Sequence, residues 1–377
     1  MDFDLSEEQR ILKKTARDFL RKESPKQWPG PGHEMPGGYS PELWRKMAEL
    51  GWLGLIIPEE YGGSGASFLD LIVLMEEMGY HLCASPFLST VVLAGVPVTV
   101  AGDQLQKGEI LPKIASGQMI LTLALAEPGA RYDAASIRVR AIRDGDAYAI
   151  SGTKLFVPDA HVAHWILCVA RTKECEDPAD GITIFLVDGG TPGVKTTPLK
   201  TIARDRQCEV IFDNVRVSEE KILGVPHHGW PVARETLEKA AVALCAEMIG
   251  GAQAVTDMAL QYAKERIQFD RPIGSFQAIQ HHFANMWMAI NGSRHLLYKA
   301  AWRIAKGMPA AMEVAMAKAR VGDVYRQVTT VGHQVFGAIG FTSEHGMHLY
   351  HRRALAGSMA FGDSDFHREV VAKSLGL

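Results

Sequence analysis

The feature that most constrains the fold is where the hydrophobic pattern changes along the chain. Apolar side chains recur at helical spacing up to about residue 118, occur in short alternating runs up to about residue 222, and return to helical spacing from about Trp230. Within the middle stretch, SIRVRAIRDGDAYAISG alternates around Asp144-Gly145, a pair typical of a tight hairpin turn. We therefore predict an α+β protein with an N-terminal helical domain (1–118), a small antiparallel middle β domain (119–222) and a C-terminal four-helix bundle (223–377).

The helical parts carry start signals and have suitable lengths. Ser6 stands three residues before Gln9, which is a capping-box pattern, and Ser40 precedes a proline and a glutamate. In the last part, three long stretches lack internal proline except at one first turn; they are residues 231–266, 276–306 and 309–336. Their length predicts helices that can build a bundle.

Composition excludes several classes of protein. Of the 377 residues, 47% are hydrophobic and 22% are charged, as in packed globular proteins. The net charge of −3 gives no overall field for nucleic acid or an anionic membrane, and no uncharged apolar run reaches the ~18 residues of a membrane span. The five cysteines are scattered without a CxxC pair, and the N-terminus is charged from its second residue, so we expect reduced thiols in a cytoplasmic protein.

Common catalytic and nucleotide motifs are missing from the sequence. No GxGxxG follows a strand pattern and no GxxxxGK[ST] occurs, so neither common glycine-rich phosphate loop is present. No HExxH, no Cys/His cluster of zinc spacing and no GxSxG elbow is found. We therefore expect no metal site and neither of the common glycine-rich nucleotide sites.

Glu247 is the first candidate for catalysis. It is the only ionisable carboxylate in AAVALCAEMIGGA, residues 240–252. A charged carboxylate facing an apolar bundle interior is costly, and burial raises the pKa of such a group toward the range that suits a general base. The alternative is that Glu247 points to solvent or caps a neighbouring backbone group.

Two further segments suit a phosphorylated or aromatic ligand. In RIQFDRPIGSFQAIQ, Arg266 and Arg271 flank Phe269, and arginines beside an exposed aromatic can hold a pyrophosphate and an aromatic ring. A helix–loop–helix corner with solvated arginines explains the same spacing. In QVFGAIGFTSEHGMHLYHRR, Gly337 and Gly340 permit close backbone approach by a ligand or a subunit.

Four segments, in order along nearly the whole chain, resemble motifs of the acyl-CoA dehydrogenase family. LALAEPGARYD is similar to LxxTEPxAGSD, ISGTKLFVPDA to GxKxWITN, and QVFGAIGFTSEH to QxxGGxGFxxE. YAKERIQFDRPIGSFQ is similar to YAxxRxxFGxPIxxFQ and is the most specific of the four. The resemblance implies the same three-part fold and an FAD-dependent enzyme, with FAD held outside a Rossmann fold and partly by a neighbouring subunit.

The resemblance also implies site residues and partners. Arg266 and Phe269 would contact the FAD of an adjacent subunit, and Phe156 would lie near the flavin ring, where the family often has tryptophan. The other residues expected to line FAD are Gln277, Gln334, Gly337, Gly340 and Ala126. The implied partners are an acyl-CoA substrate, an electron-transfer flavoprotein as electron acceptor, and further subunits in a homo- or heterotetramer.

The chain departs from the family at the catalytic base. Where many members have the glutamate of a YEG motif, this chain has Phe361, and where the isovaleryl-CoA type has its base, it has Ala240. Glu247 follows Ala240 by seven residues, close to two helical turns, so both lie on nearly the same helix face. CAEMIGGAQ also resembles a subgroup containing bacterial sterol side-chain dehydrogenases, in which the glutamate on this helix is the base. Smaller departures are Ala126, Arg131-Tyr132 and Pro158.

We predict α,β-desaturation of an acyl-CoA thioester, with Glu247 as the α-proton base and hydride transfer to flavin N5. Two alternatives stay open. The chain could be an accessory or structural subunit of a heterotetrameric dehydrogenase with little activity alone, or an oxidase relative that delivers electrons to oxygen. Beside the base, Gly250-Gly251 predict either a wide pocket for a bulky sterol-derived or branched acyl group, or close helix packing.

Overall fold

The structure, a computed structural model, describes residues 4–24, 36–129 and 132–377. The chain divides into two compact units. The helical unit comprises Met1–Glu34, Ser67–Cys83 and Ala241–Leu377, and the sheet unit comprises Met35–Ala66 and Ala84–Ala240. Each unit is therefore assembled from segments far apart in the sequence.

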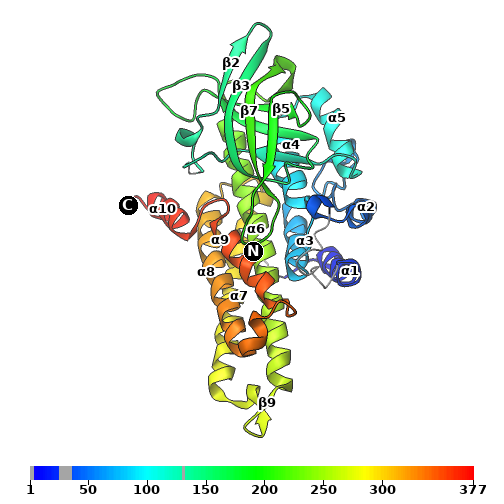
Figure 1. Cartoon of the computed structure of the whole chain (residues 1–377), viewed down its shortest axis with the longest axis vertical. Helices are drawn as coiled ribbons and strands as arrows, with labels where there is room; N and C mark the ends of the chain where they lie inside the picture. The colour runs from blue at the N-terminus through cyan, green and yellow to red at the C-terminus, as the bar shows by residue number, and fades with distance from the viewer. Residues whose placement is uncertain (1–3, 25–35, 130–131) are drawn as a thin grey trace. The chain divides into compact units, whose positions relative to one another are not determined.

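One eight-stranded sheet forms the centre of the sheet unit. Its strands are β1 (Leu121–Ala124), β2 (Arg140–Asp144), β3 (Ala147–Pro158), β4 (Trp165–Arg171), β5 (Ile182–Asp188), β6 (Val194–Pro198), β7 (Gln207–Ser218) and β8 (Ile222–Leu223). They are ordered β6-β7-β3-β2-β4-β5-β8, with β1 paired to β4 (Figure 1). Most pairs are antiparallel, as predicted, but β4 pairs in parallel with β1 and at one residue with β2.

The alternating pattern of the sequence explains the sheet. The β2–β3 hairpin turns at the predicted place, directly after Asp144, and Gly145 adopts a φ of 65° there. Apolar residues from the strands form the core of the unit, with Ile150, Ile166 and Phe185 fully buried. The helical elements of this unit are η1 (Pro36–Gly38), α2 (Pro41–Glu49), η2 (Glu59–Tyr61), η3 (Leu88–Ala94), α4 (Gly95–Ala101), α5 (Gln104–Ala115), η4 (Ala134–Ser136) and η5 (Glu219–Lys221).

Long helices dominate the helical unit. They are α1 (Glu7–Glu23), α3 (Phe68–Tyr80), α6 (Trp230–Glu265), α7 (Gln277–Ala305), α8 (Ala311–Phe336), α9 (Met347–Met359) and α10 (Ser364–Ser374). Short elements are β9 (Ile267–Gln268), β10 (Arg271–Pro272), η6 (Ile273–Ser275) and η7 (Gly337–Phe341), and residues 230–240 of α6 belong to the sheet unit. Within this unit α8 packs against α7, α9 and α10 (Figure 1).

The predicted helix starts and lengths are confirmed. Ser6 and Gln9 form the capping box of α1, and Ser40 caps α2 by accepting a hydrogen bond from the Leu43 amide. The predicted long helices correspond to α6, α7 and α8 with ends that differ by at most two residues. The predicted α+β class is likewise confirmed, whereas the domain boundaries at residues 118 and 222 stay a prediction.

Close backbone contact joins α3 to α6. A Cβ added to Gly79 would lie 1.9 Å from the carbonyl oxygen of Glu247, and one added to Gly250 would lie 1.8 Å from that of Glu76. Only glycine tolerates such an approach, since real Cβ contacts never become this short. The two glycines therefore set how closely these helices pack, and they fix the backbone on which Glu247 stands.

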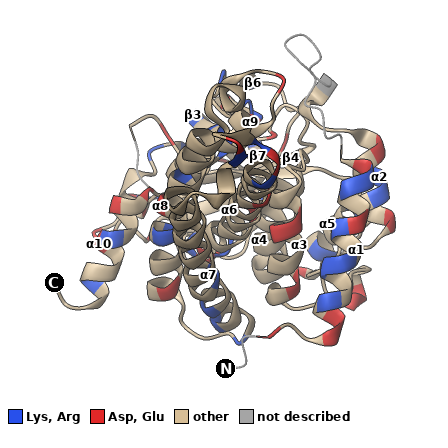
Figure 2. Ribbon diagram, turned by 90° about the horizontal axis from the view of Figure 1, so that it is seen from below, with Lys and Arg blue, Asp and Glu red and all other residues tan. Residues whose placement is uncertain are grey.

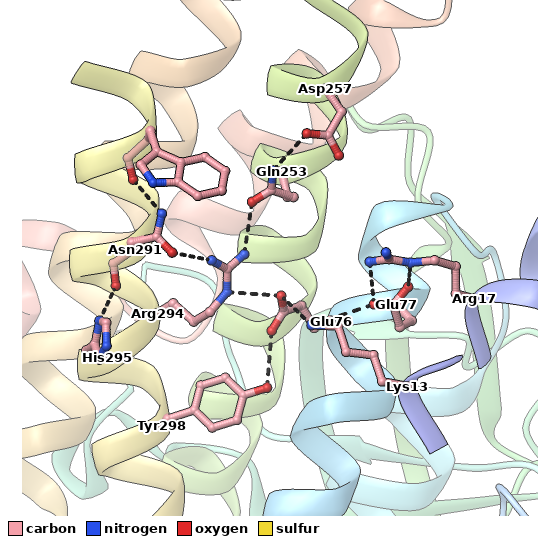
Figure 3. A network of polar contacts seen from close by, with 11 residues as sticks. Lys13, Arg17, Glu76, Glu77, Gln253, Asp257, Asn291, Arg294, His295 and Tyr298 are labelled. Atoms are coloured by element: carbon pink, nitrogen blue, oxygen red, sulfur yellow. Dashed lines mark hydrogen bonds and ion pairs between the residues drawn. The ribbon is translucent and has the colours of Figure 1, made fainter. Parts of the chain in front are cut away.

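Beside this contact, two adjacent glutamates of α3 are buried with basic partners (Figure 3). Glu76 is 4% exposed and Glu77 is 1% exposed. Arg17 of α1 donates two 2.9 Å hydrogen bonds to Glu77, and Arg294 of α7 donates a 3.1 Å bond to Glu76. Burial raises the pKa of Glu77, and the Arg17 guanidinium opposes that shift. The glutamates thus connect α3 to α1 and α7 through compensated charges.

Charges on α1 and on α2 are mixed in sign. Each helix carries both basic and acidic residues along its length, so neither presents a surface of one sign (Figure 2). All five cysteines lie within the described residues, and none of them is joined to another in a disulfide. Across the described part of the chain, no helix has the length and apolar composition needed to cross a membrane.

We expect Gly250→Ala to destabilise the protein by about 3 kcal/mol or more, because the new methyl group would overlap the Glu76 carbonyl in a contact that neither helix can relieve cheaply. Gly292→Ala is the matched control. Gly292 lies on α7 with no atom within 4 Å of an added Cβ, so alanine should be neutral or stabilising by about 0.5–1 kcal/mol. Urea unfolding midpoints measure both, and equal midpoints would contradict the packing role.

Candidate functional site

Glu247 lies on α6 and forms an ion pair with Arg353 of α9. The two side chains are 20% and 18% exposed, and the residues flanking Glu247 on α6 are fully or nearly fully buried. The sequence predicted a carboxylate in apolar surroundings, or else one in solvent. The surroundings are indeed apolar, but the guanidinium compensates the charge, so Glu247 is a paired carboxylate rather than an isolated one.

A small cavity of about 20 Å³ adjoins this ion pair. It is lined by Gly79, Leu82, Leu244, Glu247, Met248, Tyr325 and Arg353. Such a volume holds about one water molecule. An acyl group would therefore reach the carboxylate from another side, or after side chains such as Met248 move. Burial raises the pKa of Tyr325 well above its ordinary value, so its hydroxyl stays neutral.

The glycines next to Glu247 serve helix packing. A Cβ at Gly250 would overlap the α3 backbone, and one at Gly251 would lie 2.2 Å from the Tyr325 hydroxyl oxygen. Neither glycine opens space for a ligand, because the space beside each is already filled. Of the two roles that the sequence left open for this pair, the structure favours close packing and removes one argument for a wide pocket.

The two positions at which the resemblance led us to expect a base supply no carboxylate. Ala240 is fully buried on α6. Phe361 follows α9 with a φ of 57°, and its carbonyl oxygen lies 2.9 Å from Nε2 of His367. Burial lowers the pKa of His367 to about 4, so this ring is neutral at physiological pH.

Arg353 is the site residue that sequence reasoning missed. It lies on α9 four residues after Leu349 and three after Tyr350, both buried, so it belongs to the inward face of that helix. An arginine on a buried face needs an acidic partner. This signal was in the sequence, but the identity of the partner depends on how α6 and α9 pack.

In the sheet unit, Phe156 and Ala126 lie on neighbouring backbone segments. The Leu155 amide donates a 2.9 Å hydrogen bond to the carbonyl oxygen of Ala126. Phe156 is 58% exposed and adopts a φ of 54°, which is uncommon for a bulky residue. The structure thus brings these two predicted residues together and presents an aromatic ring outward. Arg131 lies outside the described residues.

In the helical unit, Arg266, Phe269 and Gln277 surround one hairpin. Arg266 follows the last residue of α6, the β9–β10 hairpin turns at Phe269-Asp270, and Gln277 begins α7. Phe269 is 85% exposed and its ring lies 6.1 Å from that of Phe276. Arg266 and Gln277 are exposed as well. Their donors and the aromatic ring are therefore accessible to a ligand.

The remaining predicted residues lie where α8 passes into η7. Gln334 is exposed, and Gly337 adopts a φ of 65° with no atom within 4 Å of an added Cβ. Gly340 is buried against Phe336. The Phe336 ring lies 5.0 Å from that of Tyr262, one turn before Arg266 on α6. This contact places the end of α8 near the end of α6, so the two groups of residues occupy the same end of the bundle (Figure 1).

These donor groups fit FAD. A guanidinium and side-chain amides suit a pyrophosphate, an exposed phenylalanine suits an aromatic ring, and the open space over Gly337 admits a ligand against backbone. The Phe156 ring with the Ala126 backbone suits a planar ring system in the same way.

Family models match the chain over most of its length. Residues 6–118 match the N-terminal domain of acyl-CoA dehydrogenases, residues 122–215 the middle domain and residues 227–376 the C-terminal domain. The chain is 34% identical over 382 residues to the probable acyl-CoA dehydrogenase YngJ of Bacillus subtilis (strain 168), covering 100% of both. It is 32% identical over 383 residues to acryloyl-CoA reductase (NADH) of Anaerotignum propionicum, covering 100% of this chain and 96% of the relative.

A solved structure agrees with the fold. Butyryl-CoA dehydrogenase from Megasphaera elsdenii superposes with a TM-score of 0.92 at 29% identity, covering 100% of both chains. A second similar structure, of an FAD-dependent dehydrogenase, superposes with a TM-score of 0.91 at 26% identity and covers 100% of both chains, which agrees with FAD as the expected cofactor. Matches to all three domain models and full-length identity above 30% show that this chain belongs to the acyl-CoA dehydrogenase family of oxidoreductases.

Proposed function

We propose that this protein is an FAD-dependent acyl-CoA dehydrogenase in which Glu247 removes the α-proton of the thioester. The observation that carries the proposal is the placement of Glu247. It is the carboxylate of an otherwise apolar segment of α6, it lines a cavity with Leu244 and Met248, and it is paired with an arginine. Neither Ala240 nor Phe361 offers an alternative carboxylate at the usual positions.

The reaction follows from these groups. The Glu247 carboxylate takes the α-proton, the electron pair of that C–H bond forms the new α,β double bond, and the β-hydrogen leaves with its own pair. FAD, when bound, supplies the acceptor for that hydride. Arg353 holds the carboxylate in one orientation and compensates its charge before the proton arrives. The cavity beside the carboxylate is small, about 20 Å³, so it leaves room for about one water molecule next to the base.

Two groups of residues would hold FAD. Phe156 and the Ala126 backbone would meet its ring system. Arg266, Phe269 and Gln277, with Gln334, Gly337 and Gly340, would hold the remainder for an adjacent subunit. The support is the exposure of these residues other than Ala126 and Gly340, and the donor groups of Arg266, Gln277 and Gln334. Membership of the acyl-CoA dehydrogenase family supports the same cofactor.

The direction of the reaction and the substrate class are part of the proposal. One relative is named as an acryloyl-CoA reductase, so relatives of this chain include a reductase as well as dehydrogenases. We propose net dehydrogenation here, in the subgroup whose base lies on the bundle helix, with an electron-transfer flavoprotein as acceptor. A bulky sterol-derived or branched acyl group is the substrate class that this subgroup suggests. An accessory subunit without activity of its own is less well supported, since the chain retains a placed carboxylate with its arginine partner.

We further propose that the chain works in the cytoplasm as a tetramer, homomeric or with a second dehydrogenase-like subunit. The five scattered cysteines, without a CxxC pair, support a reducing compartment. Exposed apolar residues at one end of the bundle, including Phe269 at 85% and Phe341 at 72%, support a subunit contact there.

Glu247→Gln should bind FAD normally and lose at least about a thousandfold in the rate of substrate-dependent flavin bleaching, because the amide cannot accept the proton. Anaerobic titration with a panel of acyl-CoAs, followed by flavin absorbance, measures the loss. Glu235→Gln is the control, since Glu235 is a half-exposed carboxylate of the same helix paired with Lys239. Equal bleaching by the Glu247→Gln and Glu235→Gln variants would refute Glu247 as the base.

Arg353→Met should destabilise the protein by about 1–3 kcal/mol, because it leaves the Glu247 carboxylate partly buried without its cation. The double variant Glu247→Gln/Arg353→Met should recover most of that loss, since no charge then stays unpaired. Thermal unfolding at constant pH gives both values. A double variant that is no more stable than Arg353→Met would show that the two residues do not depend on each other.

Phe269→Ser should leave each subunit folded, because the ring is 85% exposed, but weaken both assembly and FAD retention. Sedimentation velocity and the flavin-to-protein absorbance ratio, measured over a dilution series, follow the two together. Leu375→Ser, a substitution at a 61% exposed apolar residue near the C-terminus, is the control. Full FAD content and an unchanged oligomer in Phe269→Ser would remove this hairpin from the cofactor site.

A further inference from the structure

A buried lysine–glutamate pair lies inside the sheet unit. Lys154 of β3 is 0% exposed, and its Nζ donates a 2.6 Å hydrogen bond to the carboxylate of Glu127, which is 8% exposed. The Glu127 carboxylate also accepts hydrogen bonds from the Arg138 amide at 2.9 Å and the Val139 amide at 3.0 Å. Burial lowers the pKa of Lys154, and the carboxylate beside it opposes that shift. Both charges are therefore compensated by neighbours in the same unit.

The pair connects two backbone segments. Lys154 Nζ also donates to the carbonyl oxygen of Leu125 at 3.0 Å, and the next amide, that of Leu155, donates to the carbonyl oxygen of Ala126 at 2.9 Å. Three successive residues, 125 to 127, are thus bound by two successive residues of β3. A buried ion pair adds little net stability compared with apolar packing, so its value lies in the orientation that it imposes.

The ion pair orients the exposed aromatic ring of Phe156, which stands on strained backbone. Lys154 faces Val210 of β7 and Val157 faces Cys208, so β3 contains one residue more than β7 over this interval. Phe156 lies in that bulge with a φ of 54° and is 58% exposed. Such a backbone conformation persists only where contacts on both sides of the residue hold it in place. Lys154 provides the anchor before the bulge, and Val157, 1% exposed, provides the anchor after it.

Lys318, a buried cation of the helical unit, has a different arrangement. It lies on α8, is 1% exposed and donates to the carbonyl oxygens of Ser358 and Gly362, so the acceptors of these two bonds are backbone groups rather than a carboxylate. Lys318 thus connects α8 to the end of α9 and to the residues that follow it. It serves as a control for Lys154, because it is an equally buried lysine that lies in the other unit.

We propose that Glu127 and Lys154 are positioning residues for the cofactor: together they fix the 125–127 backbone and the Phe156 ring as one preformed surface against which the FAD ring system rests. The identity of the ligand rests on the proposed function, whereas the surface itself rests on contacts within the sheet unit. Neither side chain touches the reacting atoms, because both are buried below the surface that they shape.

The test uses the neutral double variant Glu127→Gln/Lys154→Met, in which no buried charge is left unpaired. One glutamine oxygen in the place of Glu127 Oε2 can accept from both the Arg138 and Val139 amides, which lie 2.9 and 3.2 Å from that oxygen. Its thermal midpoint should stay within about 5 °C of the parent. We expect the Leu155 amide to exchange hydrogen at least about tenfold faster, in protein stripped of FAD as well as in the loaded enzyme. The Kd for FAD should rise about tenfold or more, with a shifted visible flavin band.

Two further variants separate positioning from general stability. Lys318→Met should lower the thermal midpoint without changing Leu155 exchange or the flavin band. Phe156→Ala should raise the Kd for FAD while the Leu155 amide exchanges at the parent rate. The reason is that the pair holds the backbone whether or not the Phe156 ring is present, whereas the ring itself contacts FAD.

The outcomes distinguish this inference from the proposed function. A folded double variant with parental Leu155 exchange and a Kd for FAD within about twofold of the parent would overturn the positioning role while leaving the dehydrogenase intact. A parent protein that takes up no FAD would overturn the proposed function and the assigned ligand together. Faster Leu155 exchange in the double variant would still show that the pair holds the Phe156 segment.

Discussion

The structure depends on one close contact, that of the α3 and α6 backbones at Gly79 and Gly250. Because both positions lack a side chain, the helices approach until carbonyl oxygens fill the space that a Cβ would occupy. The close approach has one consequence on each helix. On α3 the contact buries Glu76 and Glu77, whose charges are met by Arg17 and Arg294. On α6 it fixes the turn that carries Glu247, so the candidate base stands on backbone that cannot shift without separating two helices.

Ion pairs that are partly or fully buried recur in both units, and in each unit they define orientation. Glu247 faces Arg353 in the helical unit, and Glu127 faces Lys154 in the sheet unit. An apolar pair of the same volume would pack at least as well, but it would not specify which way a carboxylate or a backbone carbonyl points. The same reasoning explains why removing one charge of an ion pair lowers the stability of the protein more than replacing both residues by neutral ones. The difference between the pairs is access: Glu247 lines a cavity, whereas Lys154 is fully enclosed.

Much of the fold could be predicted because it depends on local patterns. Helical periodicity, the Ser6 and Ser40 caps and the turn after Asp144 each act within a few residues, and each predicted element is present. Parallel pairing of β1 with β4 could not be predicted, since pairing between distant strands is decided by tertiary packing. The same limit applied to the site. Glu247 was recognisable from its apolar neighbours, but Arg353 becomes its partner only after α6 and α9 pack, and Lys154 meets Glu127 only after β3 lies beside the segment that follows β1.

The departures from the family motifs can be understood as one rearrangement. Phe361 and Ala240 stand where the resemblance led us to expect a base, and the carboxylate that α6 does supply, Glu247, is paired with Arg353 of α9. Loss of the threonine at Ala126 and of the tryptophan at Phe156 removes two side chains expected near the flavin ring. The backbone beneath them is nevertheless held by Glu127 and Lys154, both of which lie within the matched motif segments. When side-chain contacts to a cofactor are lost, a rigid backbone surface can still present carbonyl groups and one aromatic ring in fixed positions, because preorganisation lowers the cost of binding. In the proposed cofactor site, a backbone framework held by buried charges therefore remains although two of the expected side chains are replaced.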